Sequence, residues 1–117
     1  MSARLLIVED DETVAKSMAA KLLEEGYAVD VAHDGEEGLG MILEGDYQLI
    51  LTDVSMPVMS GIEMMTRAQA QKGQLKCVMV GGMAPSPMPA GMAHATFLQR
   101  PVSMPAVIAA VKAHLAG

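Results

Sequence analysis

The sequence contains a single cysteine, Cys77, among its 117 residues. One cysteine excludes an internal disulfide and fits a reducing compartment, so we expect a cytoplasmic protein. No run approaches the roughly 18 consecutive apolar residues of a membrane-spanning helix. The apolar run near the N-terminus is short and is followed by acids, unlike a signal peptide. We therefore expect no membrane partner.

Acidic residues are absent after Glu63. All fourteen Asp and Glu lie within residues 1–63, which contain three Lys and Arg, whereas residues 64–117 contain five Lys and Arg. The net charge of −6 argues against a basic patch, and we expect no nucleic-acid partner. The asymmetry indicates either a directional field and a partner surface, or an acidic site in the first half combined with chance.

Several catalytic and cofactor motifs are also missing. The sequence has no Walker loop, dinucleotide fingerprint, zinc-ligand spacing or nucleophile elbow. It has no internal repeat or low-complexity tract, and its length suits one hydrophobic core. We therefore expect residues 1–117 to form a single domain.

Short apolar segments alternate with helix signals along the whole chain. Asp34 and Ser60 each precede a glutamate by three residues, which predicts helix starts there, and Ser103 predicts the start of the last helix. The first helix follows Asp11 and ends at Glu25 before Gly26. Alternating strands and helices imply a parallel sheet with right-handed crossovers. The predicted strands are residues 5–8, 28–32, 48–52, 76–80 and 95–99.

Two segments depart from regular helix chemistry. Three prolines within five positions exclude a regular helix over residues 83–93, so the fourth helix is short or replaced by a loop. Its methionines suit either a docking surface or a loosely packed cover over the last two strands. Gly38 and Gly40 lie inside the second helix and each costs up to about 1 kcal/mol against alanine, so we expect this helix to be the weakest.

Carboxylates follow two of the predicted buried strands. Asp53 ends the apolar run 49–52, and Glu9 and Asp10 follow residues 5–8. In the sheet order 2-1-3-4-5, adopted from known doubly wound folds, strands one and three are neighbours and these acids cluster at one edge. Such a cluster either raises a pKa or recruits a cation, and its hard oxygen ligands suit Mg²⁺. The alternative is that the acids only cap helices, which we favour for Asp11 and Glu12.

The sequence resembles a response-regulator receiver domain over nearly its full length. Its motifs at residues 51–61 and 97–101 are similar to those of receivers in hybrid histidine kinases and in some stand-alone relay receivers. The resemblance implies a flavodoxin-like (βα)₅ three-layer α/β sandwich. It rests on Ile7-Val8-Glu9-Asp10-Asp11, Gly26-Tyr27, Ala32-His33-Asp34-Gly35, Leu51-Thr52-Asp53-Val54-Ser55-Met56-Pro57-Val58-Met59-Ser60-Gly61 and Phe97-Leu98-Gln99-Arg100-Pro101.

The resemblance also implies roles for individual residues. Asp53 would accept a phosphoryl group from the phosphohistidine of a histidine kinase or phosphotransfer protein in a two-component phosphorelay. Glu9, Asp10 and Asp53 would hold Mg²⁺, together with the backbone carbonyl of Ser55. Phosphoryl transfer needs in-line positioning and neutralisation of the equatorial oxygens, which Mg²⁺ provides. The protein would then be a signalling module rather than an enzyme, apart from self-catalysed transfer and slow autodephosphorylation.

The site departs from the family pattern at two positions. Gly81 stands where the family has a Thr or Ser hydroxyl, and Arg100 stands where it has lysine. Arginine is not a conservative replacement at a tight site, because a planar fork replaces a compact ammonium. Phe97 occupies the position of the family's switch aromatic, but the hydroxyl whose movement this ring would follow is missing at Gly81. We therefore expect phosphorylation to couple poorly to conformational change.

Two other functions remain open at this point. A pseudo-receiver that binds partners without phosphorylation is favoured by Gly81 and Arg100 and disfavoured by the three acids. A small Mg²⁺-dependent hydrolase lacks a substrate-binding segment. We also expect self-association to be possible through the last helix, where Ala106, Ala109, Ala110 and Ala113 form a small-residue face with Lys112.

Overall fold

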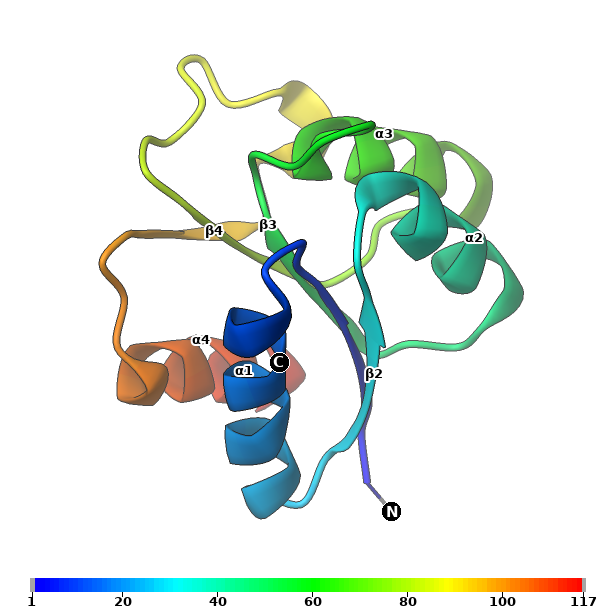
Figure 1. The fold of residues 1–117 in the computed structure, drawn as a ribbon. Coiled ribbons are helices and arrows are strands. Elements are labelled where there is room, and N and C mark those ends of the chain that lie inside the picture. Colours follow the sequence, from blue (N-terminus) through cyan, green and yellow to red (C-terminus); the bar gives the residue numbers. More distant parts are fainter. Residues whose placement is uncertain (1, 117) are drawn as a thin grey trace.

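A computed structural model describes residues 2–116 and shows one parallel five-stranded sheet between two layers of helices (Figure 1). The strand order is β2-β1-β3-β4-β5, as expected. The elements are β1 (Arg4–Val8), α1 (Glu12–Glu24), β2 (Ala28–Ala32), α2 (Gly35–Glu44), β3 (Leu49–Asp53), α3 (Gly61–Lys72), β4 (Cys77–Gly81), the 3₁₀ helix η1 (Ala90–Met92), β5 (Thr96–Gln99) and α4 (Met104–Ala116).

Alternation along the central strands creates two separate cores. Successive residues of a strand point to opposite faces of the sheet. Leu6 and Val8 face α2 and α3, whereas Leu5 and Ile7 face α1 and α4. All residues of β3 and β4 are buried, because helices cover both faces of a parallel sheet. The sheet is therefore held from both sides, and its carboxyl edge is a rigid base for the loops.

The helix starts that were predicted from capping residues are confirmed. The Asp11 carboxylate accepts hydrogen bonds from the backbone N–H groups of Thr13 and Val14. Asp34 accepts from the N–H of Glu37 at 2.8 Å, and Ser60 accepts from Glu63 at 3.1 Å. These side chains satisfy amide donors that the first turn of a helix leaves free.

The proline-rich segment forms a loop with one short turn of helix. The sequence excludes a regular helix there but does not predict η1, in which Met92 is fully buried. Gln69 of α3 fixes this turn by donating to the carbonyl of Gly91 at 2.9 Å. Met83, in contrast, is 82% exposed. The segment is thus a cover anchored at Met92, as one of the two sequence interpretations expects.

The two glycines inside α2 have different surroundings. A Cβ at Gly38 would lie 2.7 Å from Sδ of Met64 and 3.0 Å from a methyl carbon of Val8. A Cβ at Gly40 would have no atom within 4 Å. Gly38 therefore permits the close approach of α2 to β1 and α3, whereas Gly40 serves no packing purpose.

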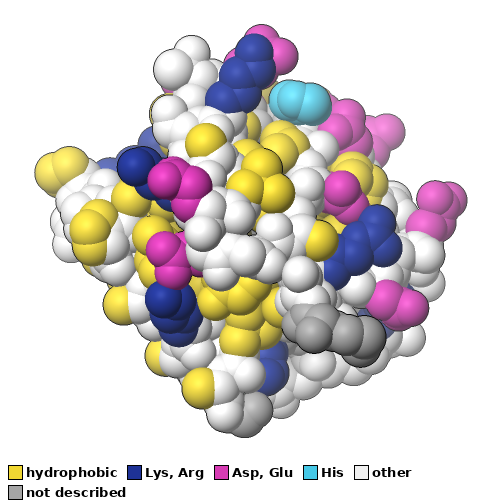
Figure 2. Space-filling model, turned by 90° about the horizontal axis from the view of Figure 1, so that it is seen from below, with side chains coloured by type: hydrophobic (Ala, Val, Ile, Leu, Met, Phe, Trp, Pro, Cys, Tyr) yellow, Lys and Arg dark blue, Asp and Glu magenta, His cyan; other side chains and the backbone are white. Residues whose placement is uncertain are grey.

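The charge asymmetry of the sequence does not produce a surface of one sign on the face in Figure 2. Acidic and basic side chains are interspersed there, with apolar side chains between them. Ion pairs also join the two halves of the chain: Lys112 of α4 lies 2.6 Å from Glu25. Among residues 2–116, no helix combines the length and apolar character that crossing a bilayer requires.

The small-residue face expected on the last helix is only partly exposed. Ala109 and Ala113 are exposed on α4, but Ala106 and Ala110 are half-buried, and Ala110 packs against the core between α4 and the sheet. The reason is the helical period, because Ala110 neighbours the fully buried Val111 and Val107 on the inner face.

Candidate functional site

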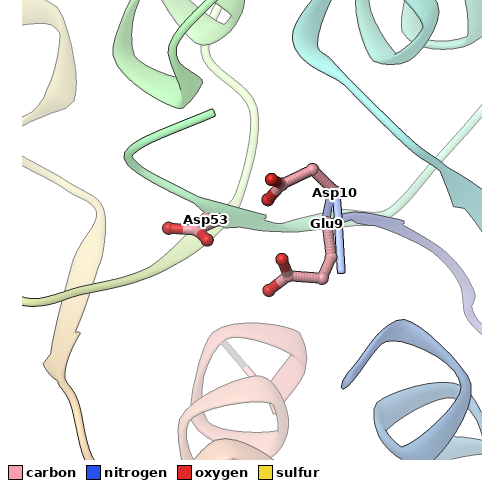
Figure 3. A group of neighbouring side chains, drawn as sticks. All are labelled: Glu9, Asp10 and Asp53. Atoms are coloured by element: carbon pink, nitrogen blue, oxygen red, sulfur yellow. The ribbon is translucent and has the colours of Figure 1, made fainter. Parts of the chain in front are cut away.

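Three carboxylates meet at the carboxyl edge of the sheet. Asp53 is the last residue of β3, and Glu9 and Asp10 directly follow β1, whose Val8 pairs with Thr52. One carboxylate oxygen from each of the three residues lies within 4.8 Å of the others. Figure 3 shows all three side chains directed toward one gap. The register of two neighbouring strands is therefore what brings together acids 43 and 44 positions apart in the sequence.

Backbone amides hold the two buried acids. Glu9 and Asp53 are buried, whereas Asp10 is exposed. One oxygen of Glu9, Oε2, accepts the N–H of Asp11 at 3.1 Å, and one oxygen of Asp53, Oδ1, accepts the N–H of Ser55 at 3.2 Å. Each carboxylate is thus oriented by the loop that follows its own strand.

Arg100 completes this acid site from the end of β5. Its Nη2 donates to Oε1 of Glu9 at 2.8 Å and to Oδ2 of Asp53 at 3.0 Å. The N–H of Arg100 donates to the carbonyl of Gly81 at 2.8 Å, which fixes its backbone beside β4. Arg100 thus lies at the site as expected from the sequence, whereas the contact of one nitrogen with both acids is evident only in the structure.

Burial dominates the electrostatics of the site. It raises the pKa of Glu9, an effect that the Asp11 N–H opposes and the Asp53 charge reinforces. It also raises the pKa of Asp53, although the Arg100 charge and the Ser55 N–H act in the opposite direction. The negative charges are therefore undercompensated, and the site favours a bound cation or proton.

The donor set fits Mg²⁺. Three carboxylates converge on one gap, and one of them, that of Asp10, is exposed to solvent. Hard oxygen ligands at a partly hydrated site suit this ion. Glu9, Asp10 and Asp53 are the residues that would hold it. The loop whose Ser55 N–H binds Asp53 also contains the Ser55 carbonyl expected as a further ligand.

Comparison with known proteins identifies the family. Residues 5–112 match the sequence profile of the response regulator receiver domain. The chain belongs to this receiver family. Receivers are signalling modules of two-component systems rather than conventional enzymes. Both the resemblance and the flavodoxin-like fold inferred from it are confirmed.

Individual relatives agree with this assignment. A CheY-like receiver domain protein from Methanospirillum hungatei is 30% identical, with a TM-score of 0.89 over 99% of this chain and 95% of that one. TrrA from Thermotoga maritima, solved in complex with Mg²⁺ and BeF, is 26% identical, with a TM-score of 0.85 over 96% and 98% of the two chains. The transcriptional regulatory protein DltR of Streptococcus agalactiae is 44% identical over 66 residues, which are 56% of this chain.

The receiver spans only part of its curated relatives. The matched stretch is 30% of the length of DltR. DltR is by name a transcriptional regulator. The net charge of −6 therefore bears on nucleic-acid binding by this receiver alone and not by its longer relatives.

Gly81, one of the two positions at which we expect a departure from the family pattern, lies on the strand next to Asp53. Gly81 is buried at the end of β4, next to Val80, which pairs with Asp53. A Cβ at Gly81 would lie 3.3 Å from Cβ of Val54 and 3.4 Å from Cε1 of Phe97. The half-buried Phe97 ring therefore packs beside the Gly81 backbone, at the position where the resemblance to the family leads us to expect a hydroxyl.

Two residues near the site have roles that the sequence analysis did not assign. A Cβ at Gly61, the first residue of α3, would overlap the carbonyl oxygen of Asp53, so only glycine allows α3 to begin there. Thr52 donates from Oγ1 to the same carbonyl at 2.9 Å. For Gly61, the available sequence signal is the Ser60-Gly61 pair at the end of the motif over residues 51–61.

The loop between β3 and α3 contains backbone strain. Val58 has φ of 72° and is 74% exposed. A β-branched residue in this left-handed region is a genuine outlier, because its Cβ approaches the following carbonyl. The loop that holds Asp53 is therefore maintained against a local conformational cost.

Proposed function

We propose that this receiver accepts a phosphoryl group on Asp53 from the phosphohistidine of a histidine kinase or phosphotransfer protein, with Mg²⁺ held by Glu9, Asp10 and Asp53. The observation that carries the proposal is the convergence of the three carboxylates around one gap at the carboxyl edge of the sheet. A chain of residues 1–117 acting as one domain, and a cytoplasmic location beside such kinases, are parts of the same proposal.

The proposed transfer is a displacement at phosphorus. One oxygen of Asp53 forms a P–O bond while the P–N bond to the donor imidazole breaks, and the imidazole nitrogen takes a proton. Bound Mg²⁺ would neutralise the equatorial phosphoryl oxygens. The Ser55 N–H orients the attacking carboxylate, since it binds Oδ1 at 3.2 Å. Arg100, which contacts Oδ2, supplies a further positive charge for the transferred group.

Acetyl phosphate with Mg²⁺, read by intact mass, tests this proposal. We expect the wild-type chain to gain the mass of one phosphoryl group, and Asp53→Ala to gain none. Asp46→Ala is the matched control, because Asp46 is an exposed acid in the loop between α2 and β3. Labelling of Asp53→Ala at the wild-type level would show that another residue is modified and would overturn the proposal.

A pseudo-receiver is the second candidate, and one observation favours it. The Phe97 ring already packs beside Gly81, which has no hydroxyl to respond to a phosphoryl group. We therefore expect beryllofluoride with Mg²⁺ to shift the amide resonances of Asp53 and Ser55 but to leave most of residues 81–99 unchanged. A large shift throughout residues 81–99 would contradict this uncoupling.

Self-association through α4 is a further part of the proposal. The exposed Ala109 and Ala113 allow another helix to approach closely, and Lys112 beside them is paired with Glu25. Sedimentation velocity should show a concentration-dependent dimer that Ala109→Glu abolishes. A strict monomer at high concentration would remove this partner from the proposal.

A further inference from the structure

Each of the four carboxylate oxygens of Glu9 and Asp53 already accepts one hydrogen bond without a metal. Oε2 of Glu9 and Oδ1 of Asp53 accept backbone N–H groups, while Oε1 of Glu9 and Oδ2 of Asp53 accept from Nη2 of Arg100. Within the described residues, no buried side-chain polar atom lacks a hydrogen-bond partner. A metal ion that takes one oxygen from each acid must therefore either share that oxygen with its present donor or displace the donor.

The contact that yields is the one to Arg100. The backbone N–H bonds are fixed by the turns after β1 and β3, whereas the Arg100 side chain is 38% exposed and can swing into water. Glu9 and Asp53 are only 3% and 9% exposed, so the guanidinium lies between the buried acids and the solvent. Nη2 also bridges two of the three groups that define the metal gap.

We propose that Arg100 is an internal cation of the acid site, which competes with Mg²⁺ and must be displaced before the ion binds. The inference rests on the proposed function, because it concerns the same metal gap. It assigns to Arg100 the control of cation affinity: the receiver holds its acids in a stable, metal-free ion pair. It becomes competent for transfer only where free Mg²⁺ is high enough to displace the guanidinium.

The competition has a physical consequence that can be measured. A guanidinium nitrogen about 3 Å from both acids repels an incoming divalent cation and occupies its ligand oxygens. Removing it should therefore raise Mg²⁺ affinity by about tenfold or more. Removing an equal charge elsewhere should change affinity much less, because exposed charges beyond about 10 Å are screened by salt.

The test is an Mg²⁺ titration followed by calorimetry and by amide resonances of Asp11 and Ser55. Arg100→Met removes the charge, and Arg67→Met is the matched control, because Arg67 pairs with Glu63 on the surface of α3 at 2.6 Å. We expect tighter binding for Arg100→Met and a nearly unchanged constant for Arg67→Met. In the wild-type protein, the Nε–H resonance of Arg100 should move with the same constant as the amides.

A second variant keeps the inference testable if Arg100→Met does not fold. Arg100→Lys retains the charge with a single compact ammonium, and should bind Mg²⁺ with an affinity between those of the wild type and a charge-free variant. Equal or weaker binding in both Arg100 variants would overturn the inference. If acetyl phosphate still labels the wild type at Asp53, only the inference has failed. If Mg²⁺ binding and labelling are absent from every variant, the proposed function has failed as well.

Discussion

The two glycines of α2 make one matched prediction about stability. Alanine is favoured over glycine inside a helix by about 1 kcal/mol, and this gain is the same at both positions. Gly40→Ala adds its methyl to open space and should gain the full amount. Gly38→Ala must place the methyl 2.7 Å from Met64 Sδ and 3.0 Å from a Val8 methyl, an overpacking that costs about 1 to 3 kcal/mol.

Thermal and urea unfolding measure both effects. For 117 residues, an unfolding entropy of about 2.1 cal/mol/K per residue converts 1 kcal/mol into about 4 °C of Tm. We therefore expect Gly40→Ala to raise Tm by about 4 °C and Gly38→Ala to lower it. In a Met64→Ala background, the loss at Gly38 should become smaller, because the nearest clashing atom is gone. Equal stabilisation by both alanines would refute the proposed close approach of α2.

Three further predictions concern the loop, the acid site and the core. Val58→Gly should raise the free energy of unfolding by about 1 kcal/mol by relieving the positive φ, whereas Val58→Ala retains a Cβ and should give no such gain. Burial raises the pKa of Asp53 in the folded state, so the protonated carboxyl group favours folding at low pH. This contribution to the free energy of unfolding is lost as pH rises through the folded pKa. Asp53→Asn should therefore stabilise the metal-free protein at neutral pH in urea unfolding, with a gain that vanishes in acid; a gain independent of pH would contradict this. Burial raises the pKa of Cys77 to about 12, so a thiol reagent should label it only at the rate of unfolding, and rapid labelling of the native protein would count against the buried site.

Local chemistry explains which parts of the fold could be predicted from the sequence. Asp34 and Ser60 cap helices through residues only three positions away, so their sequence pattern contains the whole interaction. To predict that Glu9 and Asp53 lie close together, the strand order is needed as well. That order was adopted from known folds rather than derived. Once that order holds, acids that follow neighbouring parallel strands must meet.

Features that depend on contacts between distant segments could not be predicted. The sequence assigns the same cost to Gly38 and Gly40, because only the positions of Val8 and Met64 distinguish them. The prolines exclude a long helix over residues 83–93, but the burial of Met92 against α3 determines the short η1 turn. Arg100 could be placed near the site, yet its bridge between Glu9 and Asp53 depends on side-chain geometry that the sequence does not contain.

The bridge by Arg100 also sets the order in which the site is completed during synthesis. Arg100 is separated from Glu9 by 91 positions and from Asp53 by 47, and chains emerge from the ribosome with the N-terminus first. A nascent chain therefore contains both buried acids well before the cation that neutralises them. A chain that is truncated or stalled before residue 100 lacks the cation that contacts both acids. The bridge between the two acids can therefore form only after β5 and Arg100 have been synthesised.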